Sequence, residues 1–302
     1  MRIVTACRTL IAAVALISWP TLAQQTEAAE PAPPEALERL DAYAQALTAA
    51  DLFSGVVLVA NNGEVVFERA YGMRDESSED ALKVDARFDI ASAGKMFTAT
   101  AALQQIAAGK LTLDTTLGEV LPDYPDAAMR EATIYQLLTH SAGAGETDAL
   151  FYPDSLVWHG TEPSVADLVG LYDARDPTFV PGSGQEYSNH TMTLLGRVVE
   201  VLSGQDYRSY IAEHIFEPAG MDAAHANDAC DPDDPAQAIG YVTVADERMP
   251  NCFATLDGGW PAGGQSFSAQ DLLRFVSALR EERLGVPRSL FEQATTPKLS
   301  FI

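Results

Sequence analysis

The stretch Ser92-Ala93-Gly94-Lys95-Met96-Phe97-Thr98-Ala99 begins an alanine-rich segment that runs to Gly109. This segment has good helix formers, no interior proline and a glycine at its end, which together predict a helix. The apolar positions that share one helix face with Ser92 are Met96, Ala99, Leu103 and Ile106. We therefore expect this helix to be buried in the core.

Ser92 and Lys95 are three residues apart, so their side chains are neighbours on a helix. A neutral amine beside the Ser92 hydroxyl could take its proton, and burial of Lys95 would favour the uncharged amine. The helix N-terminus would also favour negative charge on the serine oxygen. The pattern predicts a nucleophile and its base. The alternative is that Ser92 is an N-cap and Lys95 an ordinary first-turn residue.

A polar, glycine-rich turn at 181–189 leads into an apolar helical stretch at 192–202, and it carries Tyr187 and Asn189. Chemistry that begins with a serine needs a second group that passes a proton to the leaving group. A phenol held near a lysine can do this. Asn189 supplies a donor and an acceptor that could orient the lysine or a substrate amide. The alternative is that Tyr187 packs and Asn189 caps the helix.

These motifs and their flanks resemble the serine β-lactamase superfamily, particularly the branch of class C β-lactamases, D-alanyl-D-alanine carboxypeptidases and related esterases. Residues 88–98 resemble the segment around that family's nucleophile. The other similar segments are the Leu-Leu-Thr-His turn at 133–143, Tyr187-Ser188-Asn189, 215–221, and Gly263-Gly264 with 266–275. The resemblance implies an α/β fold of the α+β type, with an antiparallel sheet flanked by helices and a helical subdomain at about 113–226.

The resemblance also implies a serine hydrolase or acyltransferase that works through an acyl-enzyme on Ser92. Lys95 would help to deprotonate Ser92, Tyr187 would relay the proton to the leaving group, and Asn189 would position the lysine and the substrate. The substrate would be a β-lactam, a D-alanyl peptide or a small ester. The reaction needs no cofactor, and no zinc spacing such as His-Glu-x-x-His occurs. His140 is expected to be structural rather than a catalytic base.

One departure from the family pattern keeps an alternative open. The family carries a third motif, of the Lys-Thr-Gly or His-x-Gly type, on a strand beyond the Gly-Gly helix, and no such match occurs before Ile302. That strand supplies an oxyanion donor, whose loss costs about 10² to 10³ in rate. We therefore expect a form truncated at the C-terminus, with 299–302 as its nonnative end. The alternatives are an inactive relative, a noncatalytic binding protein for cell-wall peptide, or a split gene.

The first 23 residues are typical of a secretory signal peptide, with Arg2 and Arg8 around an apolar run at 9–19. Cleavage after Ala23 would leave a single domain at 24–302, either periplasmic or secreted. The apolar run is too short to span a bilayer, so we expect no stable membrane anchor.

Two cysteines follow the signal peptide, Cys230 and Cys252. Export would place them in a compartment that permits disulfides, so we expect a bond between them. Two reduced thiols are the alternative, because the sequence does not supply the geometry that a disulfide needs.

The acidic composition limits the partners that the chain can have. The formal net charge is −24, which repels nucleic acid and anionic membranes. The expected partner is a small-molecule or peptide substrate. An acidic stretch at 228–235 has two prolines and no loop glycine, so a solvated loop is favoured over a calcium site.

The sequence of the N-terminal part of the domain predicts a helix followed by a β-hairpin. Residues 35–49 read as an amphipathic helix, and we expect its packing face to carry Leu37, Leu40, Tyr43 and Leu47. Two apolar strands, 55–60 and 64–71, flank an Asn-Gly turn, which is a strong hairpin signal. From 113 to 226 the pattern is mostly helical.

Overall fold

A computed structural model describes residues 33–76, 80–145, 164–172, 177–226, 230–244, 246–250 and 260–297. The expected signal peptide at 1–23, Cys252 and the terminal segment 299–302 lie outside the described residues. The chain forms two compact units, the first from 1–88, 230–252 and 268–273, and the second from 89–229, 253–267 and 274–302. Helices occur together with antiparallel strand pairs, which confirms the predicted fold class.

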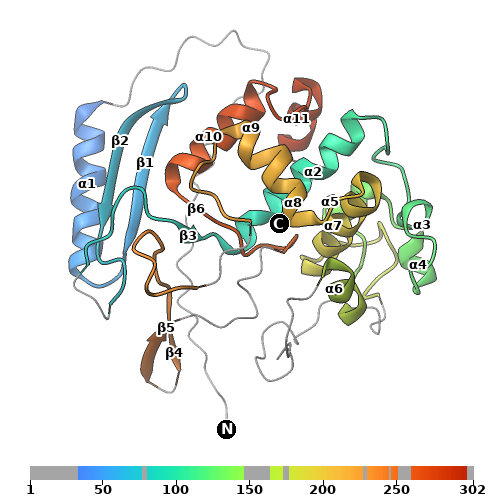
Figure 1. Cartoon of the computed structure of the whole chain (residues 1–302), viewed down its shortest axis with the longest axis horizontal. Coiled ribbons are helices and arrows are strands. Elements are labelled where there is room, and N and C mark those ends of the chain that lie inside the picture. The colour runs from blue at the N-terminus through green and yellow to red at the C-terminus, as the bar shows by residue number, and fades with distance from the viewer. Residues whose placement is uncertain are drawn as a thin grey trace. The chain divides into compact units, whose positions relative to one another are not determined.

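A β-hairpin is the main strand element of the first unit. Strands β1 (Gly55–Asn61) and β2 (Glu64–Tyr71) pair antiparallel, as Figure 1 shows. Asn62 and Gly63 between them have φ angles of 52° and 88°. Positive φ at both central residues is the requirement of a two-residue type I′ turn. The predicted hairpin and its Asn-Gly turn are therefore confirmed.

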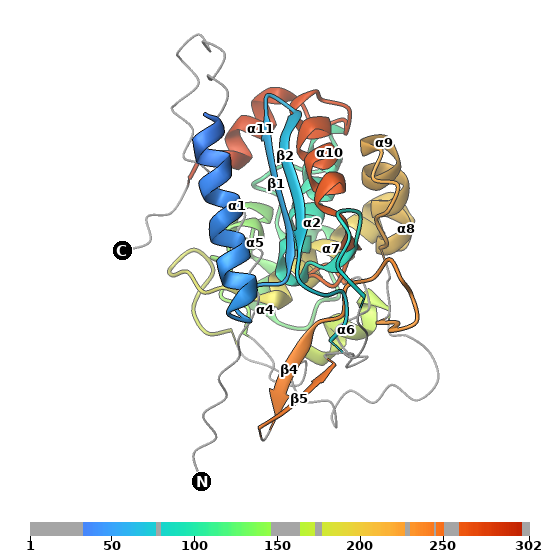
Figure 2. The same cartoon turned by 90° about the vertical axis from the view of Figure 1, so that its left-hand side faces the viewer.

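Helix α1 (Pro34–Ala49) lies along this hairpin in both Figure 1 and Figure 2. The Tyr71 hydroxyl donates to Asp41 Oδ1 at 2.7 Å, and this bond is the main cause that lowers the pKa of Asp41. The expectation that Tyr43 lies on the packing face is wrong, since Tyr43 is 64% exposed and Ala44 is buried instead. At about 100° per residue, position 44 returns to the face of Leu37, whereas position 43 does not.

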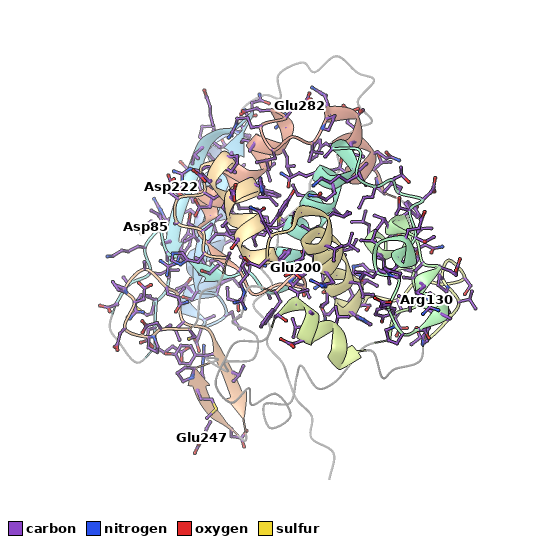
Figure 3. All side chains as sticks on the ribbon, turned by 45° about the vertical axis from the view of Figure 1, so that its right-hand side comes forward. Asp85, Arg130, Glu200, Asp222, Glu247 and Glu282 are labelled. Atoms are coloured by element: carbon purple, nitrogen blue, oxygen red, sulfur yellow. The ribbon has the colours of Figure 1, made fainter. Side chains whose placement is uncertain are left out.

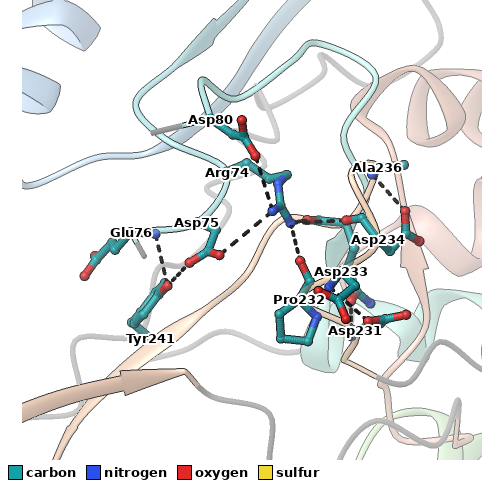
Figure 4. Close-up of polar contacts among 11 residues, drawn as sticks. Arg74, Asp75, Glu76, Asp80, Asp231, Pro232, Asp233, Asp234, Ala236 and Tyr241 are labelled. Carbon is teal, nitrogen blue, oxygen red and sulfur yellow. Dashed lines mark hydrogen bonds and ion pairs between the residues drawn. The ribbon is translucent and has the colours of Figure 1, made fainter. Parts of the chain in front are cut away.

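Two arginine side chains, Arg74 and Arg87, hold the acidic segment of the first unit, and Figure 4 shows the contacts of Arg74. The Arg74 guanidinium donates to the carbonyl oxygens of Pro232, Asp234 and Gln237 at 3.1 to 3.2 Å. Arg87 forms an ion pair with Asp234 at 2.6 Å. The stretch expected as a solvated loop is thus partly neutralised by the protein itself. A short strand pair follows it, β4 (Tyr241–Val244) with β5 (Glu247–Pro250).

The second unit is built around two helices, α2 (Lys95–Ala107) and α7 (Asn189–Ser203), which contact each other. A 3₁₀ turn at Ala91–Gly94 precedes α2. The other elements of this unit are α3 (Leu117–Val120), α4 (Ala127–Arg130), α5 (Ile134–Leu138), α6 (Val165–Tyr172), α8 (Tyr207–Ile211), a π-helical turn (Ala212–Phe216), α9 (Glu217–Ala219), β6 (Ser266–Phe267) and α11 (Arg288–Thr295). The mostly helical character predicted for 113–226 is confirmed for the described residues, and its grouping into a subdomain stays a prediction. Strand β3 (Phe88–Asp89) and helix α10 (Ala269–Arg280) each contribute residues to both units.

Helix α2 is buried in the core, as expected, and the burial extends over most of its circumference. Of the face shared with Ser92, Leu103 is buried, but Met96, Ala99 and Ile106 are only partly so. The Phe97 ring instead occupies the core, with edge-on contacts to Phe216 and Phe275 at 4.9 Å between ring centroids. A helix that other elements surround needs apolar or hydrogen-bonded side chains on every side. This explains why Thr98, Thr100 and Gln105 on α2 are also buried.

Among the described residues, no helix is long and apolar enough to cross a bilayer. Glu247, the first residue of β5, and Glu282, which follows α10, are exposed (Figure 3).

His190 on α7 is a buried ionisable group of the helical core. Its Nε2 lies 3.2 Å from the Tyr124 hydroxyl, and burial lowers the pKa of the imidazole to about 3. The unfolded chain would therefore bind a proton between pH 6.5 and pH 3 that the folded chain does not. Stability from this group is complete above about pH 6.5 and falls as the pH drops toward 3.

Substituting His190→Gln removes this titration and keeps a hydrogen-bonding side chain. We expect the free energy of unfolding of the wild type to fall with acid more steeply than that of the variant, by up to about 1.4 kcal/mol per pH unit between pH 6 and 4. Urea denaturation at several pH values measures both slopes. Equal slopes would show that His190 is not buried in its neutral form.

Candidate active site

Ser92 lies on the 3₁₀ turn immediately before α2, and its side chain is exposed. Asp89 Oδ1 accepts a hydrogen bond from the Ala91 N–H at 2.6 Å, and Ala91 adopts a φ of 47°. A left-handed backbone at a residue with a Cβ is unfavourable, so the surrounding structure must hold this conformation. The residues that cap the turn and α2 are Ile90 and Gly94, so the alternative that Ser92 is an N-cap is wrong.

Lys95 is the first residue of α2, and only 9% of it is exposed. Its Nζ lies 3.0 Å from Ser92 Oγ, 2.8 Å from Asn189 Oδ1 and 2.6 Å from the Ala262 carbonyl oxygen. The two carbonyl-type oxygens can only accept, so each takes one N–H of the lysine. The remaining position on the nitrogen is directed at Ser92.

Tyr187 approaches the same serine from the loop before α7. Its hydroxyl donates to Ser92 Oγ at 2.7 Å, and Lys95 Nζ lies 4.8 Å from the centroid of its ring. The side chain is 51% exposed, so it is not a packing residue. Ser188 caps α7 by accepting from the Thr191 N–H at 3.3 Å. Asn189 therefore does not cap the helix. Both parts of the alternative, that Tyr187 packs and that Asn189 caps the helix, are wrong.

The structure thus brings together all four residues that the sequence proposed for the site, namely Ser92, Lys95, Tyr187 and Asn189. They come from three places: the 3₁₀ turn with the start of α2, the loop before α7, and the first residue of α7. Lys95 contacts Ser92, Asn189 and the Tyr187 ring. Ser92 Oγ is within hydrogen-bond distance of both the Lys95 amine and the Tyr187 hydroxyl.

A tight turn at 260–264 completes the site, and its role was not foreseen. Trp260 and Gly263 exchange backbone hydrogen bonds of 2.8 and 3.0 Å, which orients the Ala262 carbonyl toward Lys95. Gly263 has a φ of 144°, and a Cβ there would lie 2.3 Å from the Ala91 carbonyl oxygen. The turn can approach the serine segment this closely only with glycine. The Gly263-Gly264 pair was the available signal, but it did not reveal which neighbouring carbonyl binds the lysine.

A buried hydroxyl pair fixes this turn from the core side. Thr98 Oγ1 donates to the Pro261 carbonyl oxygen at 2.6 Å and lies 2.6 Å from the Tyr207 hydroxyl. Tyr207 is fully buried, and burial raises the pKa of its phenol, so it stays protonated and can donate to Thr98. Thr98 on α2 thus holds the Pro261 carbonyl, which precedes the Ala262 carbonyl that accepts from Lys95.

His140 lies beside the site, and the structure shows no hydrogen bond between His140 and Ser92. Its Nδ1 accepts from the Ser188 N–H at 3.3 Å, and its ring centroid lies 4.9 Å from that of Tyr187. Burial, and then the charge of Lys95, lowers the pKa of the imidazole. The expected structural role of His140 agrees with these contacts.

A hydroxyl with an amine on one side and a phenol on the other is the arrangement used for nucleophilic attack with proton transfer. Within the described ranges, no three His, Cys, Asp or Glu side chains are grouped so that they could hold a metal ion.

The comparison with known proteins agrees with this geometry. The family model named Beta-lactamase matches residues 40–300. The chain belongs to the Beta-lactamase family. Esterase EstB of Burkholderia gladioli is 28% identical over 292 residues, covering 85% of this chain and 73% of EstB. D-aminopeptidase of Brucella anthropi is 29% identical over 253 residues, covering 78% of this chain and 45% of the relative.

Solved structures show the same relationship. The crystal structure of a penicillin binding protein from Bacillus halodurans superposes with a TM-score of 0.74 at 27% identity, covering 85% of this family member and 79% of that chain. The family resemblance and the fold inferred from the motifs are therefore confirmed. The match to the putative penicillin-binding protein PbpX of Bacillus subtilis covers 81% of this chain but only 59% of PbpX. The match to the D-aminopeptidase covers less than half of that relative.

Substituting Gly263→Ala tests the close approach of the turn to the serine segment. The new Cβ would meet the Ala91 carbonyl, so we expect both a loss of stability and a displaced Ser92. The matched control is Gly109→Ala, where φ is also positive, at 70°, but no atom lies within 4 Å of the added Cβ. The control should cost about 1 to 2 kcal/mol from backbone strain alone. Chemical denaturation measures both variants, and an equal cost would contradict the close approach.

Proposed function

We propose that this Beta-lactamase family member is a serine hydrolase that forms an acyl-enzyme on Ser92 from an amide or ester substrate. The single observation that carries the proposal is the placement of Lys95 Nζ and the Tyr187 hydroxyl at 3.0 and 2.7 Å from Ser92 Oγ. An amide or ester carbonyl is the electrophile that an activated serine attacks.

Lys95 is suited to accept the serine proton because its other contacts use two N–H groups. In the ammonium form, all three hydrogens are used, on Asn189, Ala262 and Ser92. In the amine form, the two hydrogens stay on Asn189 and Ala262, and the lone pair is directed at Ser92 Oγ. The same geometry therefore serves both protonation states. No reorganisation is needed when the proton moves from Ser92 to Lys95.

Tyr187 is suited to the opposite transfer, to the leaving group. As the bond from Ser92 Oγ to the carbonyl carbon forms, Lys95 takes the serine proton. When the carbonyl re-forms, the bond to the leaving nitrogen or oxygen breaks, and that atom takes the phenol proton of Tyr187. Lys95, whose Nζ lies close to the Tyr187 ring, can then return a proton to the phenolate. The products of this half-reaction are the Ser92 ester and the protonated leaving group.

Water completes the cycle by attacking the Ser92 ester. One water proton passes to the Tyr187–Lys95 pair, the hydroxyl forms the carboxylic acid, and Ser92 Oγ regains its proton. The relatives support an amide or ester substrate, since they include an esterase, a D-aminopeptidase and a penicillin binding protein. Within that class, a β-lactam, a D-alanyl peptide or a small ester are the substrates that we propose.

We also propose that residues 1–23 direct export to the periplasm or beyond the cell. Cys230 is disulfide-bonded, which suits an oxidising compartment, while its expected partner Cys252 lies outside the described residues. N-terminal sequencing of the protein recovered from a periplasmic fraction tests this. A mature chain that still begins at Met1 would contradict it.

The first test of the proposed function is covalent labelling of Ser92. We expect intact-protein mass spectrometry to show an adduct after exposure to a fluorescent penicillin or a p-nitrophenyl ester, and Ser92→Ala to show none. The matched control is Ser183→Ala on the loop before α7, which should label as the wild type does. If folded wild-type protein gives no adduct with either probe, the alternative of a truncated, inactive relative is favoured.

Substituting Tyr187→Phe tests the proton relay separately from the nucleophile. The ring remains, but the hydroxyl that donates to Ser92 Oγ is lost, so we expect the acylation rate to fall by about 10² to 10⁴. The loss should be greater for an amide than for a p-nitrophenyl ester, because p-nitrophenolate leaves without a proton. Stopped-flow absorbance with both substrates measures this difference. Equal losses would argue that Tyr187 does not protonate the leaving group.

A further inference from the structure

His140 is joined at three points to the short segment that carries Tyr187. The His140 carbonyl oxygen accepts from the Glu186 N–H at 3.0 Å, and the His140 Nδ1 accepts from the Ser188 N–H at 3.3 Å. Between these two bonds, the imidazole lies against the Tyr187 ring, with 4.9 Å between centroids and 34° between planes. His140 therefore binds the residue before Tyr187 and the residue after it, and it also contacts one face of the Tyr187 ring.

We propose that His140 is a positioning residue whose neutral imidazole holds the Tyr187 hydroxyl on Ser92, and that protonation of His140 releases Tyr187 and switches acylation off in acid. The proposal rests on the proposed function of Ser92 and Tyr187. His140 itself touches neither the serine nor the reacting atoms.

The hydrogen bonds around Nδ1 show what a proton on this atom would change. A backbone N–H only donates, so Nδ1 must present a lone pair to Ser188, and this assigns the ring proton to Nε2. Thr191 Oγ1 lies 3.1 Å from the same Nδ1, and its own hydrogen is donated to the Ser188 carbonyl oxygen at 2.8 Å. A proton on Nδ1 would therefore be donated to Thr191. The Ser188 N–H would then lose its acceptor.

The charges around His140 act in the same direction. The titratable groups that interact with His140 in the structure are Lys95 from α2 and Tyr187 from the loop. Burial keeps His190 on α7 neutral, so it adds no charge. Glu186, also on the loop, contacts His140 through its backbone N–H. Burial, and then the Lys95 charge, opposes protonation of the imidazole, so the pKa of His140 lies below its ordinary value. The neutral form then persists at neutral pH and is lost only as the pH falls below about 6.5.

The backbone of His140 makes asparagine the informative replacement. His140 has a φ of 54°, a conformation in which His, Asn and Asp are enriched among residues with a Cβ. Asparagine tolerates this backbone, offers a side-chain oxygen near the position of Nδ1, and does not titrate. Alanine at the same position keeps the backbone contacts but removes the acceptor and the ring.

The test measures Tyr187 and acylation in parallel in the wild type, His140→Asn and His140→Ala. The position of Tyr187 is followed by ¹⁹F NMR of protein labelled with 3-fluorotyrosine, with its signal assigned by Tyr187→Phe. Acylation is followed with an amide substrate, a p-nitroanilide, between pH 4 and 8, because its leaving group needs the Tyr187 proton.

In the wild type, we expect the Tyr187 signal and the acylation rate to change together, with one midpoint below pH 6.5. In His140→Asn, the rate at pH 7.5 should stay within about tenfold of the wild type, and both acid transitions at that midpoint should vanish. His140→Ala should lose about 10²-fold at pH 7.5, since a displacement of about 1 Å in a reacting group has that effect.

Two results would overturn the proposal: a Tyr187 signal that keeps the wild-type acid transition in His140→Asn, or wild-type acylation in His140→Ala. If the wild type shows no acylation at all, the proposed function fails. The NMR transition then still decides whether His140 holds Tyr187, because it does not depend on turnover.

Discussion

The structure of the second unit depends on how the Lys95 amine is held. Two carbonyl-type oxygens, from Asn189 and Ala262, take two of its N–H groups, and Ser92 occupies the third direction. A buried amine without such partners would carry a large desolvation cost. The partners in turn need α7 to begin at residue 189 and the turn at 260–264 to lie against α2. The chemistry and the packing of this unit therefore have the same centre.

Much of the site was predictable because its residues lie close together along the chain within each motif. The spacing of Ser92 and Lys95 and the pair Tyr187 and Asn189 were found from the sequence, and the hairpin followed from its Asn-Gly turn. These signals are local, since helix geometry and turn conformation depend on a few neighbouring residues. The buried polar surroundings, namely Thr98, Tyr207 and the Ala262 carbonyl, depend on which distant segments meet. Nothing in the local pattern specifies that.

The errors also have a physical origin. Tyr43 was placed on the wrong face of α1 because a large apolar residue was preferred over Ala44, although helical periodicity favours position 44. The burial of α2 in the core was expected, but its most buried positions are not those of the face shared with Ser92, because several elements surround this helix and polar residues such as Gln105 are buried beside apolar ones. Periodicity identifies a helix that packs on one side better than one that is enclosed.

The two acceptors of Lys95 lie 94 and 167 residues beyond it along the chain. During synthesis, the serine and its lysine are therefore made long before the groups that arrange them. A nascent or partly unfolded chain would contain the Ser-Ala-Gly-Lys motif but not an activated hydroxyl. Labelling of Ser92 would then report that folding has brought the last of these segments into place, and a substrate would not acylate unfinished molecules.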